Sequence, residues 1–342
     1  MQEYEALILV SFGGPEKPED VMPFLRTVSA GRAIPEARLA EVAEHYYQAG
    51  GVSPINASCR ELLGALEREL ADLSLRIYWG NRNWEPLLTS TVAQMRDDGV
   101  HRALALVTSA YGGYSSCRQY LDDIASALMA VGPGAPGISK LRLFYNHPGW
   151  VGAWGASLSE ALQGCGSEPG PPLVLFSAHS IPFAMAQTSP YVEQVSETAR
   201  LVAERVSLEH WQVVWQSRSG PPGSRWLEPG ICEVIESSGS GTVVVVPLGF
   251  VCENMEVVHD LDIEAAAAAR GAGARFVRAR TVSNDRLFVN MVRQLVEERV
   301  SGAPALALGT HGPWPDQCPA DHCPPLAPSP QGPAYHIAQA DP

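Results

Sequence analysis

A histidine stands directly after a long apolar run near the middle of the chain. Residues 173–182 read LVLFSAHSIP, so a buried strand would end near Ser177 and place His179 at its end, while Pro182 would stop further strand pairing. Near pH 7 a neutral imidazole can bind a metal ion or accept a proton. A loop histidine held by ordinary hydrogen bonds would give the same pattern, so both interpretations stay open here.

A row of acids follows a second apolar run. Residues 243–265 read VVVVPLGFVCENMEVVHDLDIEA, and in a helix Glu256, Asp260 and Glu264 would share one face, with His259 near it. Like charges at this spacing destabilise a helix by roughly a few tenths of a kcal/mol, so the row indicates a solvated face or passing metal ions. An imidazole and a carboxylate from two strand ends would suit a loosely held divalent metal.

Three glycine-rich turns carry hydroxyl and aromatic side chains. They read SFGGPEKPED at 11–20, AGGVSPIN at 49–56 and TSAYGGYSSCRQY at 108–120. None has the glycine spacing that cradles phosphates, so a nucleotide is not indicated. Such turns are either ordinary loops or the lining of an apolar cleft for a flat ligand with carboxylates at its edge. In a fourth segment, 215–229, Arg218 and Arg225 could bind carboxylates, or form only a surface salt bridge.

Short apolar runs alternate with helical patterns along the whole chain. Strands are expected at Ala6–Ser11, Leu75–Gly80, Ala103–Thr108, Leu141–Tyr145, Leu173–Ala178, Trp211–Gln216, Val243–Leu248, Arg275–Arg278 and Ala305–Leu308. Strands this apolar are usually buried on both faces of a parallel sheet, and their alternation with helices predicts a doubly wound α/β fold. Ligands of such folds bind beyond the carboxyl ends of the strands.

Nine strands are too many for one sheet in a domain of about 150 residues, so two similar halves are expected. Residues 1–148 would form the N-terminal domain, residues 149–312 the C-terminal domain, and residues 313–342 a Cys/Pro-rich, partly disordered tail.

Composition excludes several classes of protein. Of the 342 residues 46% are hydrophobic, and the net charge of −13 lacks the basic footprint of a nucleic-acid binder and would be repelled by an anionic membrane. The acidic start MQEYEALILVSF reads as a first core strand rather than a signal peptide, and no apolar run reaches about 18 residues, so we expect a cytoplasmic protein. Seven scattered cysteines indicate buried thiols rather than a disulfide framework.

Eight motifs in order resemble the ferrochelatase family, most closely its actinobacterial coproporphyrin type. They are SFGGPEKPEDV, GGVSPIN, GNRNWEP, AYGGYSSCRQY, SAHSIP, VWQSRSGPP, WLEP and PLGFV with the acids after it. The resemblance implies two Rossmann-like domains around a porphyrin cleft, and a lyase that inserts Fe²⁺ into coproporphyrin III in haem biosynthesis, with protoporphyrin IX as the alternative substrate. It makes His179 and Glu256 the metal residues, and Ser53 and Tyr114 porphyrin contacts.

The chain departs from the family's pattern at three places. Relatives commonly have Asp-His-hydrophobic-Glu where this chain has residues 253–256 as Glu-Asn-Met-Glu, so metal handling would rest more on His179. Phe12 stands where some members have a metal-binding Tyr, and it can only stack on or shield a porphyrin. Members with a [2Fe–2S] cluster bind it with four cysteines, whereas this tail supplies only Cys318 and Cys323.

The resemblance also implies a mechanism. His179 would accept the pyrrole protons and bind Fe²⁺ with Glu256, while Asp260 and Glu264 would relay metal or protons, and the carboxylates would raise the pKa of His179. Fe²⁺ would be a substrate, so catalysis would require no cofactor, and haem-pathway proteins would be the partners. Two other functions stay open: a cobalt or sirohydrochlorin chelatase, and a haem carrier without turnover.

Overall fold

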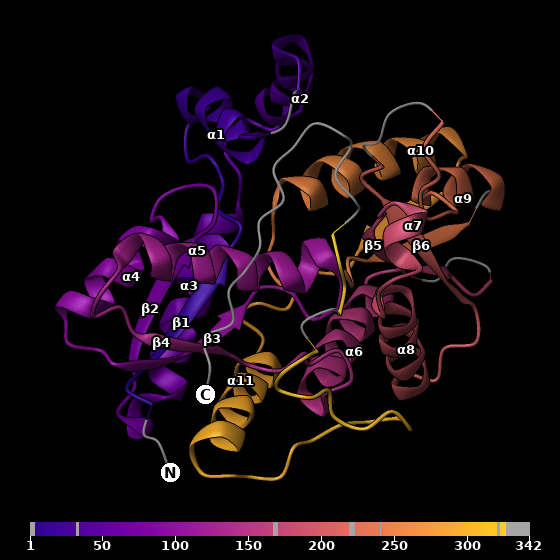
Figure 1. Ribbon diagram of the computed structural model, residues 1–342. Helices are drawn as coiled ribbons and strands as arrows, with labels where there is room; N and C mark the ends of the chain where they lie inside the picture. Colours follow the sequence, from indigo (N-terminus) through magenta and orange to yellow (C-terminus); the bar gives the residue numbers. More distant parts are fainter. Residues whose placement is uncertain are drawn as a thin grey trace.

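Two parallel four-stranded sheets form the centre of the protein (Figure 1). The computed structural model describes residues 4–31, 34–166, 170–218, 223–239, 241–319 and 322–325. One sheet has the order β2-β1-β3-β4 and the other β6-β5-β7-β8. The strands are β1 (Ala6–Ser11), β2 (Arg76–Asn81), β3 (Arg102–Val107), β4 (Gly137–Lys140), β5 (Leu173–His179), β6 (Trp211–Gln216), β7 (Thr242–Val246) and β8 (Arg275–Arg278). The expected α/β fold is confirmed, while a domain boundary at residue 148 stays a prediction.

Helices follow the strands in the same manner in both sheets. Those of the first are α1 (Val21–Val28), α2 (Glu36–Gln48), α3 (Ile55–Glu69), α4 (Leu88–Asp97), the π-helix η3 (Tyr114–Arg118) and α5 (Gln119–Val131). Those of the second are α7 (Phe183–Ala186), α8 (Tyr191–Arg205), α9 (Ile231–Ser238), the π-helix η4 (Val257–Ala265) and α10 (Ala266–Gly271). Helix α6 (Pro148–Gln163) joins the halves and α11 (Arg286–Val300) is the last helix. Among the described residues, no helix has the length and apolar character of a membrane span.

One hydrophobic core runs through both halves. Leu7 of β1 and Phe176 of β5 face it from the two sheets, and Trp150 of α6 lies within it. The opposite faces of the same strands are buried too, because Ile8 and Leu175 belong to separate outer cores. Burial on both faces explains why these strands are unbroken apolar runs in the sequence.

Helices α1 and α2 form a hairpin that stands away from the first sheet (Figure 1). The hairpin has a small core of its own, which includes Phe24, Leu25 and Leu39. The rings of Phe12 and Trp84 pack edge-on against Phe24 and attach the hairpin to the first half. The hairpin therefore rests on aromatic contacts rather than on the central core.

Two of the expected strands are wrong. Leu141–Tyr145 leaves the sheet, and Ala305–Leu308 lies beside it without strand pairing. The buried Arg142 guanidinium donates to the Glu298 carboxylate at 2.7 and 2.8 Å and to the Leu306 carbonyl at 2.9 Å. Hydrogen bonds from a side chain therefore take the place of backbone pairing between strands there. The fourth strand of the first sheet is β4, which was not among the strands expected from the sequence. Within the expected tail, residues 320–321 and 326–342 lie outside the described residues.

Candidate active site

The two residues expected to handle metal face each other. His179 is the last residue of β5, and Glu256 is the N-cap of η4, beyond the turn after β7. The Nε2 atom of His179 lies 3.5 Å from the Oε1 atom of Glu256, with the side chains 33% and 48% exposed. The Nδ1 atom of His179 is 2.5 Å from the backbone carbonyl of Ser180, which fixes the ring and leaves Nε2 toward Glu256.

A glycine permits this approach of two strand ends. A Cβ atom on Gly249 would lie 2.8 Å from the Cα atom of Ala178, closer than real side chains come. Gly249 also donates its backbone N–H to the Ser177 carbonyl at 3.0 Å. Because Gly249 has no side chain, its backbone packs directly against the end of β5. The segment that continues from Gly249 to Glu256 can therefore approach His179.

The pKa of His179 reflects two opposing effects. Partial burial lowers it, but the Glu256 carboxylate, with smaller contributions from the Ser180 carbonyl and Asp260, outweighs burial and raises the pKa to about 9. The expected direction is thereby confirmed. Near neutral pH the imidazole holds a proton, which an incoming cation must displace.

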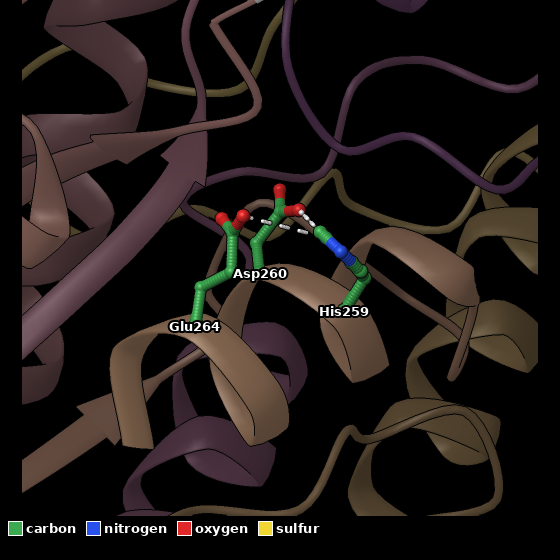
Figure 2. A group of neighbouring side chains, drawn as sticks. All are labelled: His259, Asp260 and Glu264. Atoms are coloured by element: carbon green, nitrogen blue, oxygen red, sulfur yellow. Dashed lines mark hydrogen bonds and ion pairs between the residues drawn. The ribbon is translucent and has the colours of Figure 1, made fainter. Parts of the chain in front are cut away.

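The acids of η4 gather around a second histidine (Figure 2). The Nδ1 atom of His259 lies 3.2 Å from Asp260 and 3.9 Å from Glu264. The other oxygen of Asp260 accepts hydrogen bonds from Gln216, at 3.2 Å, and from the Ser217 hydroxyl. The helix expected here is wound as a π-helix through residue 265, a geometry often found at functional sites.

Helix α2 covers this group from the other half of the molecule. The His45 imidazole stacks on that of His259 with ring centroids 4.0 Å apart and an interplanar angle of 11°. Burial raises the pKa of the Tyr46 hydroxyl, with a further contribution from the Glu256 carboxylate. His45 and Gln216 were not among the site residues expected from the sequence. A signal existed only for Gln216, a polar residue at the end of an apolar strand and paired in register with His179.

The first half supplies the residues expected to contact a porphyrin. Ser53 is 5% exposed and packs against Gly14, where a Cβ atom would lie 2.8 Å from the Ser53 hydroxyl oxygen. Phe12 lies below the Arg82 guanidinium, 5.5 Å from ring centroid to carbon. Tyr114 begins η3, and the next residue in that helix, Ser115, lies 4.0 Å from the sulfur of Met185 in α7. The third turn thus meets the segment of the second half that follows His179, whereas Phe12 and Ser53 contact residues of the first half.

The segment after β6 also borders this region. Arg225 lies over the Phe183 ring at 4.5 Å, and its carbonyl accepts the Phe183 backbone N–H at 2.9 Å. Arg218 pairs with Glu228 at 3.5 Å, as the salt-bridge interpretation predicted. Trp215 is buried and packs against Tyr191.

Comparison with known proteins identifies the family. The sequence model described as Ferrochelatase matches residues 4–300. The chain belongs to the ferrochelatase family. A protein of Rhodopirellula baltica named "Ferrochelatase" is 45% identical, with 94% of this chain and 93% of the relative covered. "Coproporphyrin III ferrochelatase" of Nocardia farcinica is 46% identical over 89% and 91%, and that of Streptomyces coelicolor 45% identical over 96% and 95%.

A solved structure shares the fold at low sequence identity. "SirB from Bacillus subtilis with Fe3+" has a TM-score of 0.54 and 13% identity, with 88% of this chain and 98% of that chain covered. The family match and this likeness agree on a chelatase-type fold with two parallel sheets. The protein is accordingly a metal chelatase by family.

The cysteines do not complete the cluster that some family members carry. Burial raises the pKa of the Cys323 thiol to about 11, with contributions from the nearby thiols of Cys117 and Cys318. All seven cysteines fall among the described residues, and Cys59 contacts Cys252 in the core at 3.9 Å. Three thiols therefore gather where a [2Fe–2S] centre usually requires four, and the cysteines present do not fit it.

Proposed function

We propose that this protein inserts Fe²⁺ into coproporphyrin III to form Fe-coproporphyrin III in haem biosynthesis, in the cytoplasm. The observation that carries the proposal is the approach of the His179 imidazole to the Glu256 carboxylate at two strand ends of a ferrochelatase-family chain. Nitrogen and oxygen ligands suit Fe²⁺, and two protein ligands leave positions open for the pyrrole nitrogens. Iron is a substrate here, so the reaction requires no resident cofactor. We propose neither a nucleic-acid partner nor a stable membrane association.

The proposed reaction exchanges two protons for one cation. Fe²⁺ forms bonds to the four ring nitrogens, and the two pyrrole N–H bonds break. The Nε2 atom of His179 is protonated near neutral pH, so it first releases that proton to solvent and then holds the incoming metal together with Glu256. As the metal leaves for the ring, His179 is our candidate for the base that accepts the two pyrrole protons one after the other and passes each to solvent. Asp260 and Glu264 continue from Glu256 along η4 and are the candidates for relaying metal or protons.

The porphyrin would lie against the first half. Ser53 and Tyr114 are proposed to contact the macrocycle, and Phe12 to stack on it or shield it. Arg225 is our candidate for a propionate contact, because its guanidinium lies on Phe183 beside the end of β5.

The choice of coproporphyrin III rests on relatives and on charge. Several relatives at about 45% identity bear the name coproporphyrin III ferrochelatase. Coproporphyrin III has four propionates and protoporphyrin IX has two, so a cationic rim favours the former. Replacing Arg225 with Gln should lower kcat/KM for coproporphyrin about tenfold and for protoporphyrin less, while Arg270→Gln, an exposed arginine on α10, serves as the matched control.

The test is anaerobic metallation by the purified protein, with Fe²⁺ and either porphyrin, followed by absorption. Faster turnover of coproporphyrin III supports the proposal. Faster turnover of protoporphyrin IX keeps the chemistry and overturns the substrate. Tight haem binding without turnover overturns the enzyme assignment in favour of a carrier, and preference for Co²⁺ with sirohydrochlorin overturns the ring and the metal.

A further inference from the structure

Two thiols from different halves of the molecule meet in the core. The Sγ atom of Cys59, in α3, lies 3.9 Å from the Sγ atom of Cys252, in the segment between β7 and η4. Both residues are buried, at 0% and 3% exposed. The pair is separate from His179 and Glu256. A bond between the two sulfur atoms would therefore join the halves at a place that the insertion pair does not use.

The surroundings of the two thiols are polar, although they lie within an apolar core. The Cys59 thiol donates to the Ser11 hydroxyl at 3.2 Å. The hydroxyls of Ser58 and Ser283 lie 2.9 Å apart, and both interact with the Cys252 thiol. These hydroxyls can hold a small polar molecule beside the sulfur atoms. A disulfide bond is about 2.0 Å long, so rotation of the two cysteine side chains has to close the remaining gap.

The two thiols differ in how readily they lose a proton. A hydrogen bond from the Cys252 thiol lowers the pKa of Cys59 more than burial raises it, and the Ser11 hydroxyl adds to the lowering. The same hydrogen bond, together with burial, raises the pKa of Cys252 well above its usual range. Cys59 is therefore the better nucleophile and Cys252 the thiol that reacts second. At Cys165 burial raises the pKa, so that thiol is a poorer nucleophile than Cys59.

The position of Cys252 connects the pair to the metal residue. The Cys252 carbonyl accepts a hydrogen bond from the Asn254 side-chain amide at 3.3 Å. The side-chain oxygen of Asn254 in turn accepts from the Val257 backbone N–H, in the first turn of η4, at 2.9 Å. Glu256 lies between these two residues as the N-cap of η4. A displacement of Cys252 toward α3 would therefore move the start of η4 and change the approach of Glu256 to His179.

We propose that Cys59 and Cys252 form a redox-active pair, which a hydroperoxide oxidises to a disulfide between the halves, and that this disulfide slows metal insertion. The formation of the bond is independent of the proposed function, whereas its effect on the rate rests on that function. Because disulfides in a reducing compartment are transient, the bond would act as a reversible regulator rather than a permanent crosslink.

The oxidation proceeds in two balanced steps. The Cys59 thiolate attacks one peroxide oxygen, the O–O bond breaks, and a sulfenic acid forms while the released hydroxide takes up a proton. The Cys252 sulfur then attacks the sulfenic sulfur, the S–O bond breaks, and the thiol proton leaves with the oxygen as water. Two thiols and one hydrogen peroxide thus give one disulfide and two waters. Because both sulfur atoms are buried, the oxidant reaches them through local opening, and the reaction is slower than at an exposed thiol.

Mass spectrometry of the full chain without porphyrin tests the bond. After treatment with hydrogen peroxide and alkylation of the remaining thiols, a non-reducing digest should contain the peptides of Cys59 and Cys252 joined to each other. A dithiol reductant should separate them. Cys165→Ala, at a buried cysteine elsewhere in the core, is the matched control and should leave the crosslink unchanged.

Anaerobic metallation, after removal of the peroxide, tests the effect on insertion. Oxidised wild-type protein should turn over about tenfold more slowly than reduced protein, because the start of η4 is displaced, and reduction should restore the rate. The Cys59→Ala and Cys252→Ala variants should keep their rates after the same treatment. The Cys165→Ala variant should lose rate as the wild-type protein does.

The two experiments separate the ways in which the inference can fail. Oxidised wild-type protein without the crosslink between Cys59 and Cys252, or with Cys59 joined to another cysteine, overturns the pair. A crosslink that leaves kcat unchanged overturns its control of insertion, as does an equal loss of rate in the Cys59→Ala variant. Failure of the reduced wild-type protein to metallate any porphyrin counts against the proposed function instead, and the mass-spectrometric result then decides the thiol pair alone.

Discussion

The two halves of the molecule share a strand order but end their strands with different residues. The central strands β1 and β5 end in Ser11 and His179, which pair in register with Asn81 and Gln216. Asn81 donates to the Asn56 side chain and to a backbone carbonyl of its own half. Gln216 instead donates to Asp260 and to the Glu256 carbonyl. Equivalent amides thus hold a loop in one half and the acidic helix in the other.

The same contrast appears after the third strand of each sheet. Both β3 and β7 lead into a π-helix, but η3 reads YSSCR whereas η4 reads VVHDLDIEA. One half presents hydroxyls and an aromatic ring, and the other presents an imidazole and acids. The backbone arrangement is common to both, so the chemistry resides in the few residues at the strand ends.

The largest expected effect separates the two central strand ends. His179→Ala should lower kcat for metallation by about 10³-fold, because it removes a metal ligand and the proposed base. Ser11→Ala, at the equivalent position, should change kcat less than about threefold. Anaerobic stopped-flow absorption measures both, and a comparable loss in the Ser11 variant would contradict the division between the halves.

The paired amides should differ in what they support. Asn81→Leu leaves the buried side-chain oxygen of Asn56 without a donor and removes one of the two donors to the Glu85 carbonyl, so it should lower the free energy of unfolding by about 3 kcal/mol. Gln216→Leu should cost less stability but lower kcat about tenfold, since Asp260 loses one of its two fixing bonds. Urea unfolding together with the metallation assay distinguishes the two variants. Equal losses of unfolding free energy and of kcat in both variants would contradict the different roles of the two amides.

The stability of the protein should depend on pH through His147, which lies at the junction between the halves. This buried residue is the N-cap of α6, and burial lowers its pKa to about 3. Between pH 6.5 and 3 the unfolded chain binds the proton that the folded protein excludes, so this contribution to stability is full above pH 6.5 and decreases as the pH falls. At pH 5 the loss should be about 2 kcal/mol.

A matched variant isolates this contribution. His147→Asn keeps a side chain that can accept from the Gly149 backbone N–H but does not titrate. Its urea-unfolding free energy should decrease less between pH 7.5 and 5 than that of the wild-type protein. Parallel curves for the two proteins would assign the acid sensitivity to other groups.

The smallest expected effect concerns the residue after β1. Phe12→Leu removes a ring that packs on Phe24 and lies under Arg82, and it should raise KM for the porphyrin about threefold with kcat nearly unchanged. Steady-state metallation at varied porphyrin measures the ratio. A change in kcat larger than in KM would assign Phe12 a part in the chemistry.

The sequence predicted the strand ends well because buried parallel strands are continuous apolar runs. β1, β6 and β8 have the predicted bounds, and the run at 173–182 located His179. The polar residues that follow such runs stand out, which indicated His179 and the row of acids, while the resemblance to ferrochelatases singled out Glu256 within that row.

Features that depend on tertiary contact could not be predicted. The stacking of His45 on His259 joins residues from two halves, and nothing in the helical pattern of α2 marks it. The π winding of η4 is a property of backbone hydrogen bonding that the side-chain spacing does not encode. The segment at 141–145 is apolar and buried yet no strand, because its burial comes from packing around Arg142 and Glu298.

The core common to both halves makes them inseparable. Trp150 of α6 packs on Phe144 from the preceding segment and on Phe288 of α11, with ring centroids 5.3 and 5.8 Å apart. A chain divided near residue 148 would expose these faces to water, so the fragments would associate rather than remain soluble on their own. Exchanging one half with that of a relative would require matched rings on α6 and α11. The two halves repeat one topology, but because they share one core neither half can be replaced independently of the other.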